Sequence, residues 1–156
     1  MSGHTPHVTY ERFVEIAPRA REALVALGKV PGEGGLDRGL IGLVKLRVSQ
    51  INGCAFCLQI HLDLARRLGV APAKLDLLAA WRDSGLFSPA EAAALAWAEQ
   101  LTCLSAAAPT EAAYADLRAH FSEADAVLLG VAIATINAWN RLGAGLRFAP
   151  GLPRAA

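Results

Sequence analysis

The sequence carries almost no excess of charge of either sign and contains few aromatic side chains. Its 156 residues include 15 lysines and arginines against 14 aspartates and glutamates, and aromatic residues make up 6% of the chain. Such a chain lacks the basic surface that nucleic acid or an anionic membrane would bind, and it lacks a stacking platform for single-stranded bases. The apolar content of 54% excludes disorder as a description of the whole chain. These absences predict a core-rich globular domain that binds neither nucleic acid nor a membrane.

Long apolar runs and export signals are also missing. Residues 1–10 have neither the basic start nor the apolar centre of a signal peptide. The longest uncharged stretch elsewhere, residues 126–140, is shorter than the roughly 20 apolar residues that a membrane-spanning helix needs. We therefore expect a cytoplasmic protein whose three cysteines are kept reduced. A disulfide in that compartment would be catalytic or redox-sensing before it was structural.

Strand patterns are nearly absent as well. No segment alternates apolar and polar residues over six or more positions, and helix-forming residues are spread along the chain. We predict one all-α domain of seven or eight helices over residues 1–156, with its core at about 10–147. Prolines and capping residues place the helices at about 10–17, 18–27, 37–51, 54–69, 72–81, 88–104, 110–120 and 122–147. The proline and glycines of residues 30–35 predict a loop.

Two cysteines and a histidine share one stripe of the helix predicted at 54–69. Cys54, Cys57 and His61 fall at i, i+3 and i+7, which places them on one face of an α-helix. Two thiols one turn apart can close a disulfide, and an imidazole beside them can take a proton. Free N–H groups at the helix start and a nearby imidazolium would lower the pKa of such a thiol and favour the thiolate. A thiolate attacks a peroxide to give a sulfenic acid, which a neighbouring thiol converts into a disulfide.

Other interpretations of the cysteine pair are weaker. A zinc site needs four ligands, and only Cys103 or a distant histidine could supply the fourth. Haem attachment requires histidine directly after the second cysteine, where Leu58 stands, and the thioredoxin pattern belongs to a βαβ fold. Cys103 itself is expected to be a small buried hydrophobic residue rather than a third redox centre.

The stretch from Leu43 to Cys57, LVKLRVSQINGCAFC, followed by His61, resembles the alkylhydroperoxidase D-like branch of the carboxymuconolactone decarboxylase family. The later stretches ALAWAEQLT at 94–102 and AIATINAWNR at 132–141 resemble that family too. The resemblance implies an all-α fold, assembly into trimers or hexamers, and thiol-dependent reduction of hydroperoxides without a cofactor or metal. It also implies a dithiol as the reducing partner.

The family's glutamate, which orients and recharges the histidine, is missing. Counting back twelve residues from Cys54 leads to Gly42, which has no side chain to relay a proton. Glu99 is the best substitute, because it lies on an apolar stripe of its predicted helix, where a lone carboxylate would be costly. We therefore predict that Glu99 lies within hydrogen-bond reach of His61 or one water away. The alternatives are that Glu99 pairs with an arginine such as Arg47 or Arg141, or that it simply points outward.

These residues predict an antioxidant peroxidase in which Cys57 attacks the hydroperoxide, Cys54 closes the disulfide, His61 is the base and Glu99 supports it. The helix dipole favours Cys54 as the attacking thiol, whereas contact with His61 and the resemblance favour Cys57. A metal-binding or redox-sensing protein without enzymatic activity, and a relative acting on a small lactone, remain alternatives. The apolar helices predicted at 88–104 and 122–147 also predict a homo-oligomer.

Overall fold

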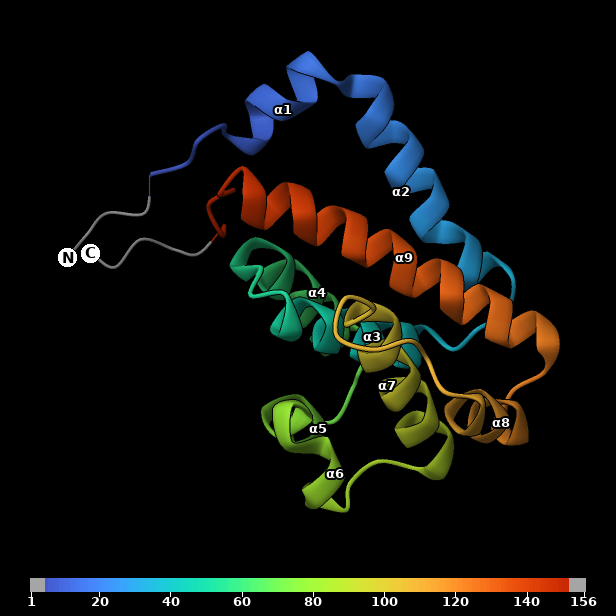
Figure 1. The fold of residues 1–156 in the computed structure, drawn as a ribbon. Coiled ribbons are helices and arrows are strands. Elements are labelled where there is room, and N and C mark those ends of the chain that lie inside the picture. Colours follow the sequence, from blue (N-terminus) through green and yellow to red (C-terminus); the bar gives the residue numbers. More distant parts are fainter. Residues whose placement is uncertain (1–4, 152–156) are drawn as a thin grey trace.

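The computed structural model describes residues 5–151, which form helices and connecting turns with no strand in that range (Figure 1). The α-helices are α1 (Tyr10–Ile16), α2 (Pro18–Glu33), α3 (Arg38–Ile51), α4 (Ala55–Arg67), α5 (Pro72–Asp76), α6 (Trp81–Ser84), α7 (Pro89–Thr102), α8 (Glu111–His120) and α9 (Glu123–Gly145). A 3-10 turn, η1 (Leu78–Ala80), precedes α6. The all-α prediction is confirmed. The helix expected at 72–81 is instead the short series α5, η1 and the start of α6.

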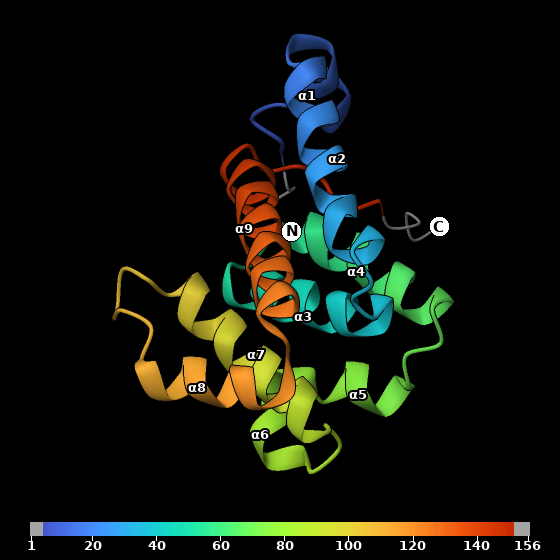
Figure 2. The same cartoon turned by 90° about the vertical axis from the view of Figure 1, so that its right-hand side faces the viewer.

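Helix α9 runs across the middle of the molecule and organises the fold. It packs against α2 on one side and against α3, α4 and α7 on the other (Figures 1 and 2). Helix α8 packs against α7, and α5 and α6 lie at the bottom of the view in Figure 1. By length and composition alone, the 23 residues of α9 could cross a membrane. In this fold its apolar residues form the core, where Leu129, Ile133 and Ile136 are fully buried.

Capping side chains fix the start of most helices, as the sequence predicts. Ser88 and Ser122 each form a complete capping box at the start of α7 and α9. Asp37 Oδ1 accepts a hydrogen bond from the Leu40 N–H at 2.8 Å at the start of α3. Each cap satisfies N–H groups that have no partner within the helix.

The prediction of a loop at residues 30–35 is wrong for residues 30–33, which are helical. Helix α2 continues through the buried Pro31 to Glu33. A proline so near the helix end removes only one backbone hydrogen bond, and the last turn is closed by the Gly34 N–H donating to the Val30 carbonyl at 2.8 Å. This additional turn of α2 lies over α3 and contributes Gly32 and Glu33 to the wall of a cavity described below.

Candidate functional site

A tight turn between α3 and α4 places the first cysteine at a helix start. Gly53 adopts a left-handed conformation with φ of +64°, which glycine reaches without steric cost. The next N–H, that of Cys54, donates to the Ser49 carbonyl at 3.1 Å and closes the end of α3. Cys54 thereby becomes the N-cap of α4, and its Sγ accepts a hydrogen bond from the Cys57 N–H at 3.4 Å.

The two thiols lie together beneath α9, and their proton affinities differ. The pKa of Cys54 is lowered to about 7, because its sulfur accepts hydrogen bonds from the Cys57 thiol, from backbone N–H groups and from Asn140. The pKa of Cys57 is raised, because its thiol donates to Cys54, is buried and faces the negative charge of Cys54. The pair thus holds its first negative charge on Cys54 and its remaining proton on Cys57.

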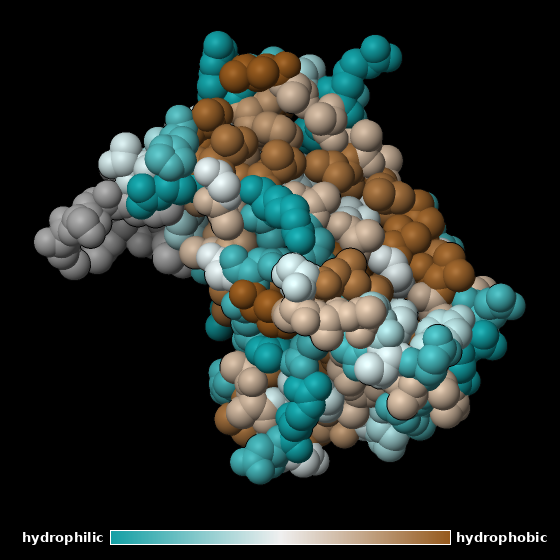
Figure 3. Space-filling model, viewed as in Figure 1, coloured by the Kyte–Doolittle hydropathy of each residue, from teal (hydrophilic) through white to brown (hydrophobic). Residues whose placement is uncertain are grey.

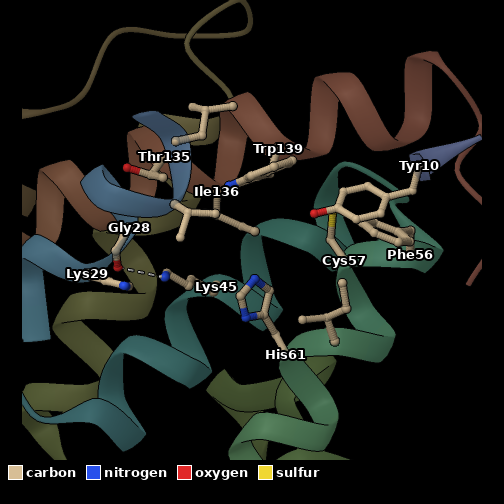
Figure 4. A pocket seen from close by; sticks show the side chains of 13 residues that line it. Tyr10, Gly28, Lys29, Lys45, Phe56, Cys57, His61, Thr135, Ile136 and Trp139 are labelled. Atoms are coloured by element: carbon tan, nitrogen blue, oxygen red, sulfur yellow. Dashed lines mark hydrogen bonds between the residues drawn. The ribbon is translucent and has the colours of Figure 1, made fainter. Parts of the chain in front are cut away.

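His61 lies one turn after Cys57 and lines a cavity with it (Figure 4). Its pKa is lowered to about 4, first by burial and then by the positive charge of Lys45. The imidazole is therefore neutral at physiological pH, and the prediction of an imidazolium that stabilises the thiolate is wrong. Nδ1 of His61 is buried and has no hydrogen-bond partner among residues 5–151.

Lys45 is a site residue that the sequence analysis did not single out. Its side chain extends from α3 toward Gly28, with Nζ 3.5 Å from the Gly28 carbonyl oxygen (Figure 4). Lys45 and His61 border the same cavities. Burial lowers the pKa of this lysine. A lone lysine among the buried residues Ile41, Val44 and Val48 of α3 is the sequence signal that could have indicated it.

Two adjoining cavities meet at Lys45 and His61. The first, of about 270 Å³, is bordered by Cys57 and by the mostly apolar residues Tyr10, Leu24, Val25, Phe56, Ile136 and Trp139 (Figure 4). The second, of about 370 Å³, extends between α2, α3 and α4 and is bordered by Gly42. Cys57 borders the first cavity, whereas Cys54 borders neither. Cys57 is 3% exposed and Cys54 is 1% exposed. A small molecule can therefore reach the pair only through the first cavity, where it contacts Cys57.

The structure does not bring Glu99 to His61, so the predicted hydrogen bond between them is wrong. Glu99 Oε1 accepts from Arg47 Nε at 2.7 Å and from Trp81 Nε1 at 2.9 Å, and Oε2 pairs with Arg82 at 2.5 Å. The reason is helical geometry: Arg47 and Lys45 are two residues apart on α3 and leave the helix on opposite sides. Glu99 therefore lies on the Arg47 side, and the alternative of an arginine partner is confirmed.

Cys103 also differs from its prediction, since it is exposed at the end of α7 rather than buried. Its place outside both cavities separates it from the thiol pair. Among residues 5–151, no group of three or more histidine, cysteine, aspartate or glutamate side chains is arranged to hold a metal ion.

A chain of amides supports the turn that carries the cysteines. Asn52 Nδ2 donates to Asn140 Oδ1 at 2.9 Å and to Asn137 Oδ1 at 3.0 Å, and Asn140 Nδ2 donates to Ser49 Oγ at 3.0 Å. The buried Asn140 thus joins α9 to the α3–α4 turn and also faces the thiols. A satisfied buried network of this kind fixes the position of the turn.

The titration of the thiol pair is a direct test of this geometry. We expect absorbance near 240 nm to report thiolate formation with a midpoint near pH 7, below the value of about 8.5 for a free cysteine. Asn140→Leu removes one donor to Cys54 and should move the midpoint upward. A wild-type midpoint at or above that of a free thiol would contradict the assignment.

Gly143 leaves the space that the two sulfurs occupy. A Cβ at this position would lie 2.8 Å from Cys54 Sγ and 3.3 Å from Cys57 Sγ. Gly143→Ala should therefore displace the thiol pair and destabilise the fold by about 1–3 kcal/mol in chemical denaturation. Gly145→Ala is the matched control, because a Cβ there meets nothing within 4 Å and alanine favours a helix over glycine. Equal stability of the two variants would contradict the close packing of Gly143.

A sequence model of the carboxymuconolactone decarboxylase family matches residues 18–100. The uncharacterized protein YdfG of Bacillus subtilis is 35% identical over 130 residues, which are 83% of this chain and 88% of YdfG. The chain belongs to the carboxymuconolactone decarboxylase family. The matched segment runs from α2 to near the end of α7 and includes Cys54, Cys57, His61 and Lys45.

Two crystal structures extend the likeness beyond that segment. One is a protein of unknown function from Agrobacterium tumefaciens, described as a candidate antioxidant defence protein AhpD, with a TM-score of 0.89 and 34% identity over 96% of this chain and 100% of the other. An uncharacterized peroxidase-related protein from Silicibacter has a TM-score of 0.74 and 26% identity, over 83% of this chain and 69% of the other. The carboxymuconolactone decarboxylase fold of this chain is thus of the alkylhydroperoxidase D type. Within it, α9 supplies Asn140 and Gly143 to the thiol pair.

Proposed function

We propose that the protein is a thiol-dependent hydroperoxide reductase. The observation that carries the proposal is the Cys54–Cys57 pair, in which one thiol carries the charge and the other borders a largely apolar cavity beside His61. The likeness to proteins described as antioxidant or peroxidase-related supports the same class of reaction.

The first step oxidises Cys57. Cys57 passes its proton to the Cys54 thiolate and attacks the outer oxygen of the hydroperoxide, so that an S–O bond forms and the O–O bond breaks. The departing alkoxide takes the proton from Cys54 and leaves as the alcohol. Cys57 has then lost two electrons and is a sulfenic acid, and Cys54 is again a thiolate. Neutral His61 offers a hydrogen-bond acceptor to the substrate O–H.

The second step closes the disulfide and prepares regeneration. The Cys54 thiolate attacks the Cys57 sulfur, an S–S bond forms, and hydroxide leaves and takes a proton from solvent to become water. A dithiol then supplies two electrons and two protons by thiol–disulfide exchange and restores both cysteines. The cycle needs no metal or organic cofactor, and a small dithiol or a dithiol protein serves as the reductant.

The experiment is consumption of tert-butyl hydroperoxide with dithiothreitol as the donor. We expect saturable consumption and, with the donor left out, one disulfide formed for each hydroperoxide reduced. Consumption no faster than in the absence of protein would overturn the proposal. About one zinc per chain with inert thiols would favour the metal-binding alternative.

Self-association is part of the proposal. Hydrophobic residues gather along α2 and α9 on the face shown in Figure 3. The exposed large hydrophobic residues of these two helices are Leu27 and Val30 on α2 and Val127 on α9, the last of them 61% exposed. Exposed apolar surface of this kind favours contact between copies of the chain, in agreement with the predicted homo-oligomer.

A further inference from the structure

Two groups at the junction of the cavities invite a ligand: the half-buried ammonium of Lys45, which has no counter-charge among residues 5–151, and the buried Nδ1 of His61. Nδ1 of His61 is without a hydrogen-bond partner in the part of the chain that the structure describes. In the same part, Lys45 forms no ion pair, and its contact is a long one to the Gly28 carbonyl. A half-buried charge without a counter-charge and a buried unsatisfied nitrogen both cost free energy, and an anion placed between them would offset both costs.

The charges around the second cavity favour such an anion. Three cationic side chains, Lys29, Arg38 and Lys45, border it, against the single carboxylate of Glu33. Glu33 is exposed and forms no ion pair within residues 5–151, so it leaves the charge of Lys45 uncompensated.

The space for an anion is present because α3 has no side chain at Gly42. Gly42 and Lys45 are three residues apart and lie on the same face of α3. A Cβ on Gly42 would touch only the Ala65 Cβ, at 3.7 Å. Gly42, Lys45 and His61 together border the second cavity of about 370 Å³.

We propose that the Lys45 ammonium and the His61 imidazole bind the carboxylate of an organic ligand, whose apolar body occupies the cavity beside Cys57. Within its described residues, the chain places no carboxylate beside these two groups, so the ligand supplies it. The ligand carboxylate pairs with the Lys45 ammonium and accepts a hydrogen bond from Nδ1–H of His61. The apolar residues Leu24, Ile136 and Trp139 enclose the body of the ligand. If the proposed function holds, the preferred substrates are hydroperoxides of apolar carboxylic acids. Carboxylate binding itself does not depend on the reaction.

Octanoate and octan-1-ol, which carry no peroxide, test the site by calorimetry on the full chain at neutral pH. We expect octanoate to bind about 10–100-fold more tightly than octan-1-ol, because a hydrogen-bonded charge is gained in a buried site. Lys45→Met should remove this preference. It should leave octan-1-ol binding within about threefold, since the apolar wall is unchanged.

Two further variants keep the test decisive. Arg67→Met removes an exposed charge of the same sign outside both cavities and should change octanoate binding by less than about threefold. Gly42→Glu, for which the cavity has space, places a carboxylate within the chain and should weaken octanoate about tenfold or more by occupying the site. Equal binding of octanoate and octan-1-ol, or a preference that survives Lys45→Met, would overturn the inference. That result would leave the peroxidase proposal intact, because peroxide reduction is measured separately.

Discussion

Cys57→Ser should abolish hydroperoxide reduction, with turnover falling by about 10³-fold or more, as expected when a covalent nucleophile is removed. Cys54→Ser should lose steady-state turnover to a similar degree but retain a single oxidation. The difference arises because Cys57 borders the cavity and Cys54 does not. In Cys54→Ser the sulfenic acid at Cys57 has no neighbouring thiol, so trapping with dimedone and intact-mass measurement should detect it.

The matched control is Cys103→Ser, since Cys103 is exposed and lies outside both cavities. Its turnover should stay within about twofold of the wild type, because surface substitutions away from the site have small effects. Sulfenic acid that accumulates in Cys57→Ser and is absent from Cys54→Ser would reverse the roles of the two thiols.

Glu99→Leu should strongly lower the free energy of unfolding. The carboxylate is 16% exposed, accepts hydrogen bonds from Arg47 and Trp81, and forms an ion pair with Arg82. Its loss leaves a largely buried guanidinium and an indole N–H without an acceptor, at a cost of about 3–5 kcal/mol in urea unfolding. The exposed ion pair of Arg12 and Glu15 provides the comparison, and Glu15→Leu should cost less than about 0.5 kcal/mol.

The contribution of Glu99 should also depend on pH. Burial raises the pKa of Glu99, but hydrogen bonds from Trp81, Arg47 and Arg82 outweigh burial and lower it. Because the folded chain binds this proton less tightly than the unfolded chain, the contribution is complete above about pH 4.3 and is lost as pH falls below it. The gap in stability between wild type and Glu99→Leu should therefore narrow in acid. Unchanged stability together with a 10²–10⁴-fold loss of turnover per folded molecule would restore the role of Glu99 as a relay.

Much of the fold follows from local chemistry that is visible in the sequence. Pro18, Asp37, Ser88 and Ser122 are helix-start signals, and the structure begins helices at or directly after each of them. The end of α2 was not predictable in this way. Pro31 breaks a helix by propensity, but in the structure it is buried inside the last turn of α2.

The thiol pair was predictable because its members are close in sequence, whereas the partners of the pair were not. Glu99 lies on an apolar stripe of its helix, which indicates that the side chain is buried but not which residue it contacts. Its partner Arg47 is 52 residues away in the sequence. Gly143 and Asn140 reach the cysteines only through the packing of α9 on α4. Lys45 was visible in the sequence, yet its role depends on the empty space at Gly42 and on His61 from another helix.

The cap at the start of α4 has a consequence for electron transfer. The sulfur of Cys54 that accepts the Cys57 N–H is the same atom that must enter the disulfide. The helix start stabilises the thiolate, and the negative charge is lost when the disulfide forms. Stabilising the reduced form in this way raises the reduction potential of the pair above that of the same two cysteines without the cap. In the proposed cycle the oxidised protein would thereby be a better electron acceptor, and a weakly reducing dithiol would suffice to return it to the reduced state.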